Sequence, residues 1–250
     1  MNSTVAALTS RSLLGRKRPL VLLLLPVALL ALCTLARVLS NLDRDVERDL
    51  NATLAPDLLT AFGIAILMPL LSLIAGTGAI APEIDEGSIV YLLAKPLNRY
   101  SIVVTKLAVA IAVVIAFGVL PVAIAGVVLT GEVGTVTVAF TVGALAAGVA
   151  YAAVFLLLAV VTRNAVVVGL IYALIWESLV GGLVPGAQTL SVQQWSMAVV
   201  ERVLGDDAER LRVFAAVDFT TGLVLLTVVT VAATAYAGRR LQSLRLSDDS

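Results

Sequence analysis

The stretch VTVAFTVGALAAGVAYAAVFLLLAVV, residues 136–161, decides the fold class of this chain. It contains no charged residue and consists mainly of Val, Ala and Leu, which suit a helix that faces lipid. It is also longer than the roughly 20 apolar residues that a helix needs to cross the hydrocarbon core of a membrane. We therefore expect residues 136–161 to form a membrane-spanning helix.

Five more runs along the chain meet the same criterion. They lie at about residues 20–39, 57–81, 102–129, 165–184 and 217–237. Pro26, Pro69 and Pro121 fall inside the first three runs, where each can kink a helix. We predict an all-α integral membrane protein with six transmembrane helices in a single domain over residues 1–250. An even number of spans places both termini on the same side of the membrane.

The composition agrees with a membrane protein and excludes several kinds of chemistry. Hydrophobic residues make up 60% of the chain, charged residues only 14%, and the mean hydropathy is +1.04. Soluble domains are nearer half apolar and a quarter charged. Aromatic residues are only 5%, which leaves few surfaces on which bases could stack, so we expect no nucleic-acid partner. The single cysteine, Cys33, is expected to be a small buried residue of the first span.

The chain also lacks the residues that common catalytic sites require. It has no histidine, which excludes His-ligated zinc, Ser–His dyads and imidazole ligation of haem. It has no Gly-x-x-x-x-Gly-Lys-Ser/Thr sequence, so it carries no P-loop for ATP phosphates. We expect no bound cofactor and no catalytic residue, and any use of ATP must occur on another subunit.

Lys and Arg residues predict the orientation. With the N-terminus in the cytoplasm, most of the 17 basic residues lie on the inner side, and the outer loops are richer in acids. The positive-inside rule therefore favours cytoplasmic N- and C-termini in the plasma membrane. The inner residues are Arg11, Arg16, Lys17, Arg18, Lys95, Arg99, Lys106, Arg163, Arg239, Arg240 and Arg245.

Three segments outside the spans carry predictions of their own. Residues 1–19 are expected to form an interfacial helix on the inner leaflet, or alternatively a frayed basic tail. Residues 185–216 form an external segment in which Val192, Trp195, Val199 and Val203 have helical spacing. This pattern predicts a short amphipathic helix at the outer interface with Trp195 at headgroup depth, as a plain anchor or as a gate. Residues 238–250 are expected to be a cytoplasmic tail.

The most informative segment for function is the loop between the second and third spans, residues 82–101, which we call the coupling loop. Acidic residues gather at its start, an apolar face follows at helical spacing, and Lys95-Pro96 marks a helix end. An apolar face with a charged rim suits a protein groove, although a helix resting on the inner leaflet is the alternative. The candidate docking residues are Glu83, Asp85, Glu86, Gly87, Ile89, Leu92, Leu93, Lys95, Pro96 and Arg99.

This segment resembles the corresponding loop of the permeases of the ABC-2 type export family. There the loop commonly has one or two acids, a Gly, a run ending in Leu-Leu, then Pro, a short gap and Arg, and finally a Lys in the next helix. The matching residues are Glu83, Glu86, Gly87, Leu92, Leu93, Pro96, Arg99 and Lys106. Thr105 departs from the pattern, because a Gly is frequent there. The overall arrangement of spans and external segment is similar as well.

The resemblance implies a permease subunit of an ATP-driven exporter. The coupling loop would contain a coupling helix that docks on a separate cytoplasmic ATPase, which would bind ATP and Mg. Two permease subunits, identical or different, would form one transporter in contact with membrane lipids. The short external loops and apolar interior favour a hydrophobic or amphiphilic cargo. A secondary transporter, a membrane-embedded enzyme and a non-transporting anchor or assembly factor remain as alternatives.

Glu177 is the one acid well inside a predicted span. It lies roughly 18 Å along the fifth run when counted from Ala165 at ~1.5 Å per residue. A carboxylate in lipid is costly, so Glu177 is a candidate for the substrate path. Alternatively, it pairs with a hydroxyl or amide, or reaches external water. In the fourth span, the small residues of the pairs Gly143/Ala147 and Ala144/Gly148 predict that another helix can approach closely.

Overall fold

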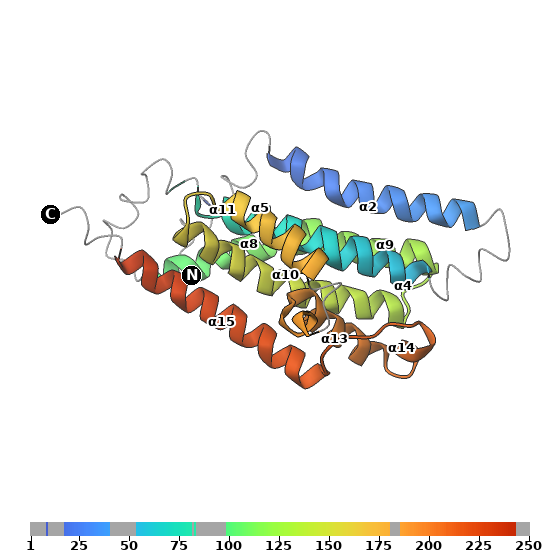
Figure 1. Ribbon diagram of the computed structural model, residues 1–250. Coiled ribbons are helices and arrows are strands. Elements are labelled where there is room, and N and C mark those ends of the chain that lie inside the picture. Colours follow the sequence, from blue (N-terminus) through green and yellow to red (C-terminus); the bar gives the residue numbers. More distant parts are fainter. Residues whose placement is uncertain are drawn as a thin grey trace.

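The computed structural model describes residues 9, 18–40, 54–81, 83, 99–180 and 186–243. Every regular element in these ranges is a helix, which confirms the expected all-α class. Long helices lie side by side in a bundle, with α2 along one edge and α15 along the opposite edge (Figure 1).

Among the described residues, five helices are long and apolar enough to cross a membrane. The first is α2 (Arg18–Ser40), and the second joins α4 (Ala55–Leu58), η2 (Leu59–Leu67) and α5 (Met68–Gly78). The third joins α8 (Arg99–Val114), η3 (Ile115–Val119) and α9 (Leu120–Thr130). The last two are α10 (Thr135–Val161) and α15 (Phe219–Ser243). Five of the six predicted apolar runs thus form helices of spanning length.

The fifth predicted run differs. It forms α11 (Ala165–Ile171) followed by η4 (Tyr172–Val180), and its apolar part, Ala165–Glu177, is shorter than a full span. The prediction of a sixth spanning helix over 165–184 is therefore not confirmed, and residues 181–185 lie outside the described part of the chain. The chain continues as η5 (Ala187–Leu190), α13 (Val192–Leu204) and α14 (Asp207–Arg210).

Two of the three prolines inside spans coincide with irregular helix. Pro69 and Pro121 each follow a π-helical segment, η2 and η3 respectively. A proline has no N–H, and its ring displaces the carbonyl four residues earlier. The regular hydrogen bonds between residues i and i−4 are therefore disrupted just before the proline. The amides of Met68 and Leu120 bond instead to the carbonyls five residues back, at Gly63 and Ile115. Pro26, in contrast, lies within α2, which is one continuous α-helix.

Helix α10 forms the centre of the bundle and packs against α5, α8, α9, α11, α13 and α15. Its small residues allow this close packing, as the sequence predicts. A side chain at Gly143 would overlap Val200 of α13, and a Cβ at Gly148 would lie 2.6 Å from Met68 Cε. These glycines therefore serve contacts within the chain. On the other side of the bundle, α2 packs along α9, and Arg37 donates to the Leu129 carbonyl at 3.3 Å.

Candidate functional site

A buried lysine lies beside the coupling loop. Lys106 is in the second turn of α8, and its side chain is fully buried. Its Nζ donates to Glu83 Oε1 at 2.6 Å, to the Ala79 carbonyl at 2.7 Å and to Thr9 Oγ1 at 3.5 Å. Burying a charge is expensive unless it is paired and hydrogen-bonded, and the Glu83 carboxylate supplies the opposite charge.

The partners of Lys106 come from three separate parts of the chain. Ala79 directly follows α5, Glu83 lies at the start of the coupling loop, and Thr9 belongs to the N-terminal segment. Because Lys106 itself lies just after the loop, the ion pair ties the entry of the loop to its exit. The structure thus brings together Glu83 and Lys106, two residues of the motif that resembles ABC-2 permeases.

Most of the predicted docking residues lie outside the described residues. These are Asp85, Glu86, Gly87, Ile89, Leu92, Leu93, Lys95 and Pro96. Arg99 begins α8, and Glu83 pairs with Lys106. The docking role of the set stays a prediction. Sequence reasoning included Lys106 only as a motif residue and as an inner charge, and it did not predict the pairing. A lysine near the start of one apolar run, with an acid just after the end of the preceding run, was the available signal.

The second polar site surrounds Glu177, which is fully buried in η4. Its Oε1 accepts hydrogen bonds from the Tyr172 hydroxyl at 2.7 Å and from the Val192 amide at 3.1 Å. Its Oε2 accepts from the Ser191 hydroxyl at 2.5 Å and from the Gln193 amide at 3.2 Å. The carboxylate therefore sits on the N-terminus of α13, where the helix dipole and unpaired amides favour a negative charge.

This arrangement realises one of the alternatives that the sequence left open, because Glu177 pairs with hydroxyls and backbone amides. Four hydrogen bonds occupy both carboxylate oxygens, and the three from Ser191, Val192 and Gln193 join η4 to the start of α13. Tyr172 is also part of an aromatic row, since its ring meets Phe155 edge-on and Phe155 stacks on Tyr151, with centroids 6.1 and 6.0 Å apart. The geometry supports a role in positioning α13, and a role in the substrate path stays a prediction.

Helix α13 forms where the sequence predicts an amphipathic helix, but its apolar face is covered by protein. Val192 and Val199 are buried, and the helix packs against α10 and α15. Trp195 is only 5% exposed, and its Nε1 donates to the Thr189 carbonyl at 2.8 Å. Protein therefore covers most of the Trp195 side chain, and its position at headgroup depth stays a prediction. Helical spacing shows that one face is apolar, but it does not show whether lipid or protein covers it.

Together, these features define a helical, multi-pass membrane protein whose buried charges join segments of its own chain. Comparison with known protein families identifies the class more closely, because the family described as "ABC-2 family transporter protein" matches residues 16–242. Since this match covers most of the chain, the protein belongs to the ABC-2 transporter family. Members are membrane transport components that typically lack an ATPase site and normally work with a cytoplasmic ATPase. Comparison with curated proteins gives no significant match.

Proposed function

We propose that this protein is the permease subunit of an ATP-driven exporter. It docks through the coupling loop on a separate cytoplasmic ATPase subunit, which binds ATP and Mg, and it works with a second permease subunit. Both termini lie in the cytoplasm, and the complex resides in the plasma membrane. Membership of the ABC-2 family supports this proposal, and the observation that carries the coupling role is the buried Lys106–Glu83 pair beside the loop.

The pair supports coupling for a mechanical reason. A loop that moves with an ATPase shifts the membrane helices only if its ends are firmly attached to them. Lys106 connects the loop entry at Glu83 with the end of the second span at Ala79 and with the third span, to which it belongs. A displacement of the loop therefore moves both spans together, as a switch between inward-open and outward-open states requires.

The cargo that we propose is hydrophobic or amphiphilic. Small residues and aliphatic side chains dominate the interior, and the buried residues of α10 are mostly Ala, Gly and Phe. An ion-driven secondary transporter is a weaker candidate. Glu177 was its best ion-binding residue, but both oxygens of this carboxylate already accept hydrogen bonds from η4, from Ser191 and from the start of α13.

Co-purification tests the coupling role. The chain is co-expressed with a candidate ABC ATPase subunit that carries an affinity tag. Leu92→Asp and Leu93→Asp are expected to abolish recovery of the permease, because each places a charge on the predicted apolar docking face. Val133→Asp is the matched control, since Val133 is 77% exposed in the turn between α9 and α10. Full recovery of both leucine variants would overturn the assignment of the coupling loop.

A further inference from the structure

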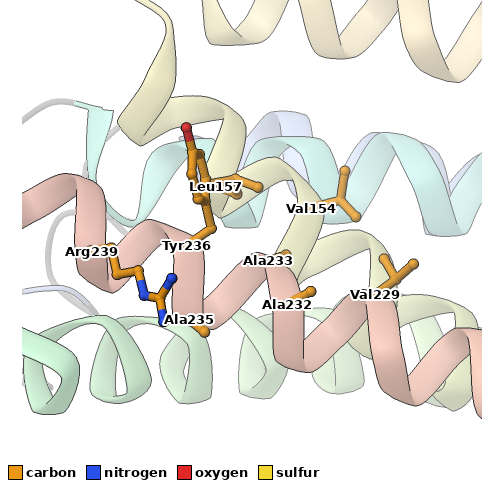
Figure 2. A pocket seen from close by; sticks show the side chains of 8 residues that line it. All are labelled: Val154, Leu157, Val229, Ala232, Ala233, Ala235, Tyr236 and Arg239. Carbon is orange, nitrogen blue, oxygen red and sulfur yellow. The ribbon is translucent and has the colours of Figure 1, made fainter.

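An open groove runs along the surface where α10 packs against α15, next to the C-terminal half of α10 (Figure 2). Its volume is about 580 Å³, which is within the range of sites that hold small ligands. Val154 and Leu157 of α10 form one wall, and the other wall consists of α15 residues that include Ala232, Ala235, Tyr236 and Arg239.

Side-chain size explains why the groove is open. Alanines occupy consecutive turns of α15, so this helix presents little volume toward Val154 and Leu157. Further along, Gly238 brings α15 against Tyr100 of α8, where a Cβ would lie 2.5 Å from the aromatic ring. α15 therefore approaches α8 closely at Gly238, and a channel with apolar walls stays open beside the direct contacts of α15 with α10.

The groove has one charged end. Arg239 is exposed, and it makes no hydrogen bond or ion pair with any residue that the structure describes. It lies two residues before Leu241, the end of the spanning part of α15, and Tyr236 is one turn earlier. An aromatic ring and a cation at the end of a span are the side chains that occupy the headgroup region of a membrane.

We propose that this groove binds an anionic phospholipid of the inner leaflet. The acyl chain lies along Leu157 and Ala232, and the lipid phosphate pairs with the Arg239 guanidinium. This inference rests on the cytoplasmic placement of the C-terminus in the proposed function. Basic pockets between membrane helices on the cytoplasmic side are suited to anionic headgroups. A helix of a second copy would have to supply an acid to pair with Arg239 or bury its charge unpaired, whereas a lipid phosphate provides the counter-charge at the correct depth.

Native mass spectrometry of the purified full-length permease tests the proposal. The delipidated protein is incubated with phosphatidylglycerol or phosphatidylcholine of identical chains, and retained lipid is counted. The wild type is expected to retain phosphatidylglycerol preferentially. Arg239→Gln should reduce that retention about fivefold, as expected for one arginine near an anionic surface. Arg240→Gln is the matched control, because this neighbouring arginine is exposed, does not line the groove and has an interaction of its own.

A second variant tests the apolar part of the site. Ala232→Phe fills the groove and is expected to reduce retention of both lipids equally, while Arg239→Gln reduces retention of phosphatidylglycerol more than that of phosphatidylcholine, whose choline cation already offsets its phosphate. Equal retention of the two lipids by the wild type, or unchanged retention in Arg239→Gln, would overturn the proposal. The proposal would also be overturned if the Ala232→Phe variant no longer formed a permease dimer but still retained lipid. The groove would then be a subunit interface. The measurement uses the permease alone, so its failure is distinct from a failure to bind the ATPase.

Discussion

Removing one member of the Lys106–Glu83 pair should have unequal effects, depending on which charge remains. Lys106 is fully buried, whereas the Glu83 side chain is 21% exposed. Glu83→Gln leaves the ammonium group buried with only neutral partners, the Ala79 carbonyl and the Thr9 hydroxyl. Lys106→Met leaves a carboxylate on a side chain that is partly exposed, although its Oε2 atom is itself buried. Glu83→Gln is therefore expected to be the more destabilising substitution.

The magnitudes follow from the burial of the remaining group. An unpaired buried charge costs about 3–5 kcal/mol, which is the expectation for Glu83→Gln. Lys106→Met loses a hydrogen bond between charged groups, which is worth about 1.5–3 kcal/mol. The double variant Glu83→Gln/Lys106→Met contains neither charge, so it should be more stable than Glu83→Gln alone. The two substitutions are thus expected to be non-additive by about 2 kcal/mol or more.

Equilibrium unfolding in mixed micelles measures these free energies for the wild type, both single variants and the double variant. Arg163→Gln serves as a control, because Arg163 is an exposed basic residue in the turn between α10 and α11. Additive effects of the two substitutions within about 0.5 kcal/mol would refute the reasoning, since contacting charges must couple. Equal losses in the two single variants would refute the part that depends on burial.

Three further predictions concern single contacts. Glu177→Ala should make the first amides of α13 exchange with deuterium several-fold faster, because they lose their acceptor, and unchanged exchange would contradict the capping role. Gly76→Ala should lower the free energy of unfolding by about 1–3 kcal/mol, since its Cβ would lie 2.9 Å from the Ala152 carbonyl oxygen. Gly63→Ala, with 3.5 Å to Val122, should be neutral, and equal melting temperatures of the two variants would oppose this reasoning. The amide and hydroxyl of Thr221 lower the pKa of Asp218 below its ordinary value of 3.8. The resulting stabilisation is present at neutral pH and is lost as the pH falls through that lowered pKa, so Thr221→Val should flatten the acid limb of a plot of melting temperature against pH.

The sequence by itself predicted the features that depend on neighbouring residues. The length of an apolar run determines whether one helix can cross a membrane, and five of the six runs form helices of that length. Of the three prolines at which the sequence predicted a possible kink, Pro69 and Pro121 follow irregular helix, because the missing N–H acts on the preceding turn, whereas Pro26 lies in a continuous α-helix. The motif of the coupling loop indicated the ABC-2 family, and the family match over residues 16–242 confirms that membership.

The tertiary structure alone decided how distant residues meet. It showed that Lys106 pairs with Glu83, that Glu177 binds the start of α13, and that Trp195 is buried in protein. An apolar or charged side chain in the sequence only requires some partner, and many arrangements of the same helices would satisfy that requirement. Which partner it finds depends on close contacts such as Gly143 against α13, which bring together segments far apart in the chain.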